Sequence, residues 1–124
     1  MEFKSANELK MNEQLTPFFW TEHESSTSLC HYVGGFKDEV FALRADEGFE
    51  GGGYDWEQLA IVFLNEKMPE LKNEINFDSE ASMFCAYIEN SEDINNFKKF
   101  ALGFRNMCDN EEMMKDLFSR AELD

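Results

Sequence analysis

Apolar and polar residues in the first third of the chain follow the pattern of a β-hairpin. Residues 17–20 (Pro-Phe-Phe-Trp) and 29–33 (Leu-Cys-His-Tyr-Val) are rich in the aromatic and β-branched residues that favour strands, and the polar run 24–28 between them is typical of a turn. The same pattern returns later in the chain. We expect a second hairpin there, with strands at 75–78 and 83–88.

Two longer segments have apolar residues at helical spacing. The first begins after a glycine-rich stretch, where Asp55 is expected to be the N-cap and Gln58 the partner residue of a capping box, and it ends at about Lys67, before Pro69. Its predicted buried face consists of Trp56, Leu59, Ala60, Phe63 and Leu64.

The second helix is expected to be capped by Ser91 and to carry an apolar stripe, with a short acidic helix at 111–121 after it. The residues of the stripe are Ile94, Phe97, Ala101, Phe104 and Cys108, with Phe100 and Met107 beside it. The short helix should turn Met114, Leu117 and Phe118 inward.

Other segments read as irregular. Residues 1–13 are polar and predict a loosely ordered start, residues 36–44 are compatible with either a third strand or a short helix, and the glycines within 47–53 predict a flexible loop.

Together the elements predict one α+β domain over 1–124, a two-layer fold. Its antiparallel sheet has about four strands, from two hairpins, and two to three helices cover one face.

The net charge of the chain restricts the kinds of partner that it can bind. The chain has 11 basic and 26 acidic residues, a net charge of −15, which repels nucleic acid and anionic membranes and favours encounter with basic surfaces. Its 3 cysteines are an odd number without a CxxC pair or a preceding signal segment, so we expect free, buried, inert thiols in a cytoplasmic protein. The longest apolar run, residues 59–64, is too short to span a bilayer.

Three kinds of chemistry fit the residues poorly, so we predict no cofactor, metal or catalytic group. Cys30 and His31 would point to opposite faces of one strand, which prevents them from sharing a metal ion. No catalytic signature surrounds the cysteines or histidines. The glycine-rich loop lacks the Lys-Ser/Thr ending of a phosphate-binding loop and is crowded with acidic residues.

The loop is better suited to binding a basic protein, because aromatic anchors rimmed by carboxylates are typical of such contacts. Phe49 and Tyr54 are expected to be exposed there. The predicted partner-binding residues are Asp46, Glu47, Phe49, Glu50, Tyr54 and Asp55. The segment 109–124, with 6 acids and 2 bases, is the rival surface.

The segment 44–56, with its glycine-tyrosine-aspartate-tryptophan core, resembles immunity protein 51 of bacterial polymorphic toxin systems. The similarity extends over residues 17–20, 63–64, 77–87 and 116–123. Gly52 replaces the polar residue expected between the glycines, which bears on the flexibility of the loop.

This resemblance implies a cytoplasmic antidote that binds a cognate toxin domain, such as a basic nuclease, and it carries no catalytic residues. Two alternatives stay open. One is a small enzyme that reverses a toxin-made modification with carboxylates such as Glu47, Glu50 and Asp55, and the other is a regulatory binding subunit without a toxin.

Overall fold

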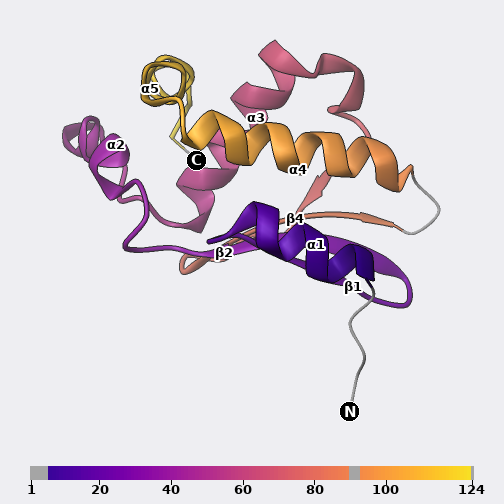
Figure 1. The fold of residues 1–124 in the computed structure, drawn as a ribbon. Helices are drawn as coiled ribbons and strands as arrows, with labels where there is room; N and C mark the ends of the chain where they lie inside the picture. The colour runs from indigo at the N-terminus through magenta and orange to yellow at the C-terminus, as the bar shows by residue number, and fades with distance from the viewer. Residues whose placement is uncertain (1–5, 90–92, 124) are drawn as a thin grey trace.

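The computed structural model describes residues 6–89 and 93–123. Within these ranges the chain forms five α-helices, four strands and two short 3₁₀ helices (Figure 1). Their order is α1 (Ala6–Leu15), β1 (Phe19–Glu22), β2 (Ser26–Tyr32), α2 (Asp38–Ala42), η1 (Ala45–Glu47), α3 (Gly53–Lys67), η2 (Pro69–Leu71), β3 (Asn76–Phe77), β4 (Met83–Glu89), α4 (Ile94–Cys108) and α5 (Glu111–Phe118). The predicted α+β class is confirmed.

Both predicted hairpins are present, and they join into one antiparallel sheet with the strand order β1-β2-β4-β3. The inner strands of the two hairpins pair with each other in a register that sets Leu29 opposite Ala86 and Cys30 opposite Cys85. Because β2 and β4 occupy the centre, the edges of the sheet are the short strands β1 and β3.

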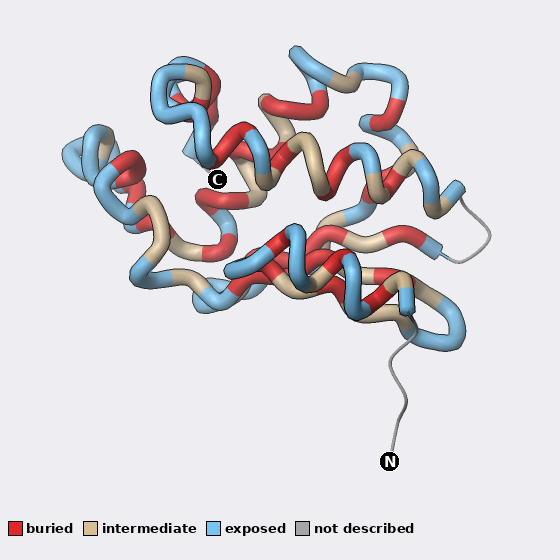
Figure 2. Tube along the Cα trace, in the orientation of Figure 1, coloured by how far each residue is buried: buried red, intermediate tan, exposed pale blue. Residues whose placement is uncertain are grey.

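The sheet and the helices form two layers, with α3, α4 and α5 on one side of the sheet (Figure 1). Strand residues alternate between faces. Leu29 and Phe84 belong to the hydrophobic core between the layers, whereas Tyr32, on the opposite face, is 67% exposed. Figure 2 shows the same division, with buried segments gathered where the sheet meets the helices.

Aromatic side chains fill this core. Trp56 of α3 is fully buried and packs edge-on against Phe18 at a centroid distance of 5.5 Å and against Phe104 of α4 at 6.2 Å. Each such buried side chain contributes about 1.5–3 kcal/mol through removal of apolar surface from water. The residues predicted to face inward on α3, α4 and α5 are all buried except Ile94, which is partly buried.

The expectation of a loosely ordered start is wrong for the described residues, because Ala6–Leu15 is the helix α1. Its polar side chains bind the free edge of β1. Asn12 accepts a hydrogen bond from the Trp20 N–H at 2.8 Å and donates one to the Trp20 carbonyl at 2.9 Å, and Glu8 accepts from the Glu22 N–H at 2.9 Å. The helix therefore satisfies backbone groups that an edge strand would leave open.

Other boundaries also differ from the expectation. The ambiguous segment 36–44 contains a helix, α2, and the last helix ends at Phe118. The cap of α4 is Asp93, whose side chain accepts from the Asn95 N–H, while Ser91, the predicted cap, lies outside the described residues.

Candidate functional site

Residues 48–53, here called the glycine loop, connect η1 to α3 and are held in one conformation by the backbone. Gly48 and Gly51 have φ values of 109° and 78°, in the left-handed region that favours glycine. Gly53 lies directly against the β3–β4 turn, where its N–H donates to the Ala81 carbonyl at 2.9 Å. A Cβ atom at Gly53 would stand 1.9 Å from the Glu80 carbonyl oxygen. These contacts argue for an ordered loop, where the glycines alone predict a flexible one.

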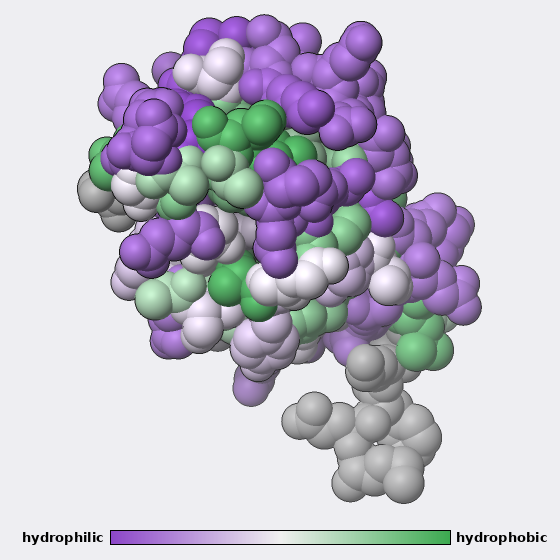
Figure 3. All heavy atoms as spheres, turned by 90° about the vertical axis from the view of Figure 1, so that its left-hand side faces the viewer, coloured by the Kyte–Doolittle hydropathy of each residue, from purple (hydrophilic) through white to green (hydrophobic). Residues whose placement is uncertain are grey.

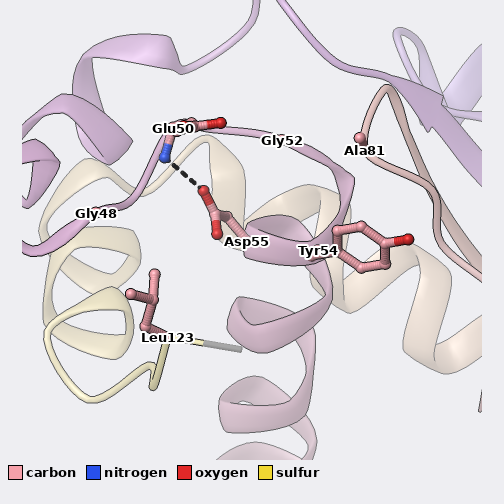
Figure 4. Close-up of a pocket in the computed structure, with 7 residues that line it drawn as sticks. All are labelled: Gly48, Glu50, Gly52, Tyr54, Asp55, Ala81 and Leu123. Carbon is pink, nitrogen blue, oxygen red and sulfur yellow. Dashed lines mark hydrogen bonds between the residues drawn. The ribbon is translucent and has the colours of Figure 1, made fainter.

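Asp55 fastens the loop from inside the helix. The prediction that it is the N-cap is wrong, since Gly52 occupies that position and Asp55 lies in the first turn. Its carboxylate reaches back and accepts a hydrogen bond from the Glu50 N–H at 2.7 Å, which Figure 4 shows. It accepts a second one from the Gly51 N–H at 2.8 Å. Because Asp55 is only 8% exposed, it acts as an internal anchor.

Phe49 is a second anchor. It was expected to be exposed, but it is 3% exposed and packs edge-on against Phe118 of α5 at a centroid distance of 4.9 Å. The left-handed residues on each side of it, Gly48 and Gly51, let the loop curl so that this ring enters the core. The side chain therefore stabilises the loop and does not present an exposed contact surface.

Arg44 links the start of the site to the C-terminal segment. Its Nη1 donates to the carbonyls of Phe118 at 2.6 Å and Ala121 at 2.7 Å, and its guanidinium lies 4.4 Å from the Phe49 ring centroid. Two further hydrogen bonds join it to Glu47 at 2.7 and 2.8 Å. These hydrogen bonds lower the pKa of Glu47, so that this carboxylate stays ionised and tied to η1.

The remaining candidate residues face solvent. Asp46, Glu47 and Glu50 are exposed, and Tyr54 is 44% exposed, as expected for it. Glu50 and Gly52 line two hollows, of about 300 and 570 Å³. Gly48, Glu50, Gly52, Tyr54, Asp55, Ala81 and Leu123 line the smaller hollow, in which Tyr54 and Leu123 lie on different sides of Asp55 (Figure 4).

The larger hollow shares Glu50, Gly52 and Ala81 with the smaller one and includes Asp38 and Phe49 in its lining. Among the described residues, the linings of both hollows contain carboxylates, and neither contains lysine or arginine. Glu50 borders both. The structure thus brings Glu50, Tyr54 and Asp55 together at one hollow, whereas Asp46 and Glu47 lie in η1 outside either lining.

Sequence reasoning missed Ala81 and Leu123, which belong to the walls of the smaller hollow. Both are distant in sequence from the glycine loop and have no distinctive local pattern. Arg44 stands at the start of the segment that carries the family resemblance, which is the one signal that could have directed attention to it.

The rival acidic surface is partly neutralised by ion pairs. Arg120 pairs with Asp116 at 2.8 Å and with Glu66 at 2.6 Å, and Lys115 pairs with Glu111 at 3.0 Å. The hydrogen bonds from Arg120 lower the pKa values of Asp116 and Glu66. Figure 3, which views the molecule from the side of α2 and α5, shows a mostly hydrophilic face with smaller apolar patches between the polar groups.

The cysteines and His31 occupy the faces that strand alternation predicts. His31 lies in the aromatic core, 5.2 Å from Trp56 between ring centroids, and Cys30 is on the other face of β2. All three thiols are free and buried. Within the described residues, no group of three or more His, Cys, Asp or Glu side chains is arranged to hold a metal ion.

In the part of the chain that the structure describes, no helix has the length and apolar character needed to cross a bilayer. Searches of curated proteins and of solved structures found no match. The family model described as immunity protein 51 matches residues 18–123, which include the whole sheet, the glycine loop and the helices α2 to α5. The chain therefore belongs to the immunity protein 51 family.

Proposed function

We propose that this protein neutralises a cognate bacterial toxin domain by binding it in a stoichiometric complex, in the cytoplasm of the cell that makes both. Membership of an immunity protein family supports a toxin as the partner. The observation that carries the mode of action is the pair of acidic hollows at the glycine loop, where Glu50 lines both hollows and the exposed Tyr54 lines the smaller one.

The contact surface in this proposal consists of Asp46, Glu47, Glu50 and Tyr54. Tyrosine at the centre of an interface buries a large apolar ring while its hydroxyl keeps a polar partner. Glu50 borders both hollows, so a basic side chain of the toxin that enters either one meets a carboxylate. Phe49 and Asp55 contribute by holding this surface in shape, and the acidic segment 109–123 is the second candidate surface.

A basic toxin domain, such as a nuclease, fits this surface electrostatically. A net charge of −15 attracts a basic partner from a distance and raises the association rate, which can approach about 10⁸–10⁹ M⁻¹s⁻¹ at low salt. Fast capture is useful to an antidote, because toxin that escapes damages the cell before binding.

Site-directed variants test the proposed contact surface. A tagged copy of the protein first isolates from its source cells the partner that it retains in stoichiometric amount, and the affinity of each variant for that partner is then measured. Tyr54→Ala and Glu50→Lys should each weaken binding at least tenfold, with little change in thermal stability because both side chains are exposed. Leu9→Ala and Glu13→Lys are matched controls on α1, where Leu9 is 53% exposed and Glu13 is exposed.

If the α1 controls weaken binding and the loop variants do not, the proposed surface is wrong. Salt supplies an independent test of the charge argument. The association rate should fall steeply between low and physiological ionic strength, and a rate that does not change with salt would remove electrostatic steering from the proposal.

Titration of toxin activity separates binding from catalysis. A stoichiometric inhibitor abolishes activity at one molecule per toxin, whereas an enzyme that reverses a modification protects at a small fraction of that amount. The contacts of the candidate carboxylates support the inhibitor, since Glu47 is tied to Arg44 and Asp55 to backbone N–H groups. Protection at substoichiometric amounts would overturn the proposal.

A further inference from the structure

Two of the three cysteines face each other across the centre of the sheet. Cys30 of β2 is directly opposite Cys85 of β4, and their Sγ atoms are 3.3 Å apart. The Cys85 N–H donates to Ser79 Oγ, and the Cys85 carbonyl accepts from the Asp78 N–H, so both backbone groups point away from β2.

The two cysteines therefore form a non-hydrogen-bonded pair, the type in which opposite Cα atoms approach to about 4.5 Å. A disulfide requires Cα atoms about 4.4–6.8 Å apart. The strand register thus already holds the two residues within the range of a disulfide, and the sulfur atoms need to close by little more than 1 Å to reach a bond length of about 2.05 Å.

The surroundings of this pair differ from those of the third cysteine. Cys30 and Cys85 are 7% and 9% exposed and lie on the sheet face opposite the core, beside the exposed Tyr32. Cys108 is 0% exposed within the core, where burial raises its pKa to about 12. Small molecules therefore have a shorter path to the pair than to Cys108.

One thiol of the pair is also activated by the other. A hydrogen bond from the Cys30 S–H lowers the pKa of Cys85, which favours the thiolate on Cys85 and keeps the proton on Cys30. Carboxylates at Asp78 and Glu80 oppose the negative charge. The same carboxylates repel anionic oxidants such as glutathione disulfide, and the small remaining exposure excludes bulky ones.

We propose that Cys30 and Cys85 form a reversible dithiol site that small uncharged peroxides oxidise to a disulfide between β2 and β4. The Cys85 thiolate attacks one oxygen of hydrogen peroxide, the O–O bond breaks, and the departing hydroxide takes a proton to become water. Cys30 then loses its proton and attacks the sulfenic sulfur, and the S–O bond breaks with release of a second water. The two thiols thus give two electrons to one peroxide. A small dithiol then reduces the disulfide back to two thiols and is itself oxidised to a disulfide.

The test uses the reduced full-length protein treated with one equivalent of hydrogen peroxide, followed by alkylation in denaturant and peptide mass spectrometry. The expected product is a monomer that has lost two thiols, contains a peptide linking Cys30 to Cys85, and carries an alkylated Cys108. Dithiothreitol should restore all three thiols. In urea, Cys108 should react as readily as the other two, because the strand register no longer selects the pair.

Single variants give the sharpest controls. Cys30→Ser should stop the reaction at a sulfenic acid on Cys85, detected by mass spectrometry as the gain of one oxygen atom. Cys108→Ser should leave disulfide formation unchanged. Oxidation of the folded protein at Cys108 as fast as at the pair would overturn the proposal. The proposal would also be overturned if Cys30 and Cys85 remain available for alkylation after the peroxide has oxidised a peptide with a free cysteine in the same tube.

Discussion

Replacing Asp55 by alanine should destabilise the protein by about 3 kcal/mol, although this aspartate stands in a segment that reads as a surface loop. Its carboxylate accepts hydrogen bonds from Glu50 N–H at 2.7 Å and Gly51 N–H at 2.8 Å, and the Gly51 bond is buried. Hydrogen bonds to a charged group contribute about 1.5–3 kcal/mol each. Water can solvate the part-buried Glu50 N–H in the variant, so the expected loss lies below the sum for two bonds.

Asp55→Asn is the matched variant for this experiment. Both backbone N–H groups bind the same atom, Oδ2, so an amide oxygen placed there can still accept from each without the full charge. We therefore expect Asp55→Asn to lose about half as much stability as Asp55→Ala. Urea denaturation followed by circular dichroism gives the free energy of unfolding for both proteins, and unchanged m-values would show that the unfolded states are comparable.

Two results would refute this reasoning. A loss below about 1 kcal/mol for Asp55→Ala would mean that the anchor contributes little and that the loop is held by its other contacts. Equal losses for the two variants would mean that the full negative charge carries the effect, and that a neutral oxygen acceptor in the same place contributes nothing.

Four further outcomes follow from the geometry, each measured as a free energy of unfolding. Gly53→Ala should cost about 3 kcal/mol, because its Cβ would lie 1.9 Å from a carbonyl oxygen that belongs to the backbone. Phe49→Ala should lower the free energy of unfolding by about 3–5 kcal/mol, as for other buried phenylalanines. A decrease of less than about 1 kcal/mol would mean that Phe49 is not buried in the folded protein. Oxidation of Cys30 and Cys85, 55 residues apart, should stabilise the protein by up to about 4 kcal/mol through constraint of the unfolded chain, and urea titrations of the oxidised and reduced forms measure this. Burial lowers the pKa of His31, so below pH about 6.5 the unfolded chain binds a proton that the folded protein does not. The free energy of unfolding should therefore decrease as the pH falls from about 6.5 to the lowered pKa of His31. His31→Phe should remove this dependence of stability on pH.

Local sequence patterns predicted the elements whose stability is decided locally. The two hairpins follow from clusters of aromatic and β-branched residues around polar turns, and α3 and α4 follow from apolar residues at helical spacing. The pairing of β2 with β4, which places Cys30 opposite Cys85, depends on contacts between distant segments. No local pattern encodes that register.

The helix α1 shows why the start of the chain was misread. Its sequence is polar, and its role becomes visible only beside β1, where Asn12 and Glu8 bind backbone groups that a neighbouring strand would otherwise bind. Eight of the ten residues of α1 are good helix formers, and the contacts with β1 add the tertiary stabilisation that so short a helix needs.

The placement of the aromatic side chains in the candidate site could not be predicted from the sequence. Phe49 and Tyr54 are aromatic residues of the same acidic, glycine-rich stretch, yet one is 3% exposed and the other 44%. The backbone turns at Gly48 and Gly51 decide between them, and the sequence records those turns only as glycines. The same glycines suggested flexibility, but Gly53 is required by close approach to the Glu80 carbonyl.

This rigidity changes what the glycine loop can contribute to binding. A flexible loop loses affinity because its backbone must be ordered on association, at a cost of about 1–2 kcal/mol for each residue. Asp55, Phe49 and the Gly53–Ala81 hydrogen bond already fix the backbone that carries Glu50 and Tyr54. If the glycine loop is the contact surface that we propose, loosening an internal anchor should weaken toxin binding without removing any contact. Asp55→Ala and Tyr54→Ala should both lower affinity, but only Asp55→Ala should lower stability as well. This difference distinguishes a residue that holds the loop in shape, Asp55, from a residue that contacts the partner, Tyr54.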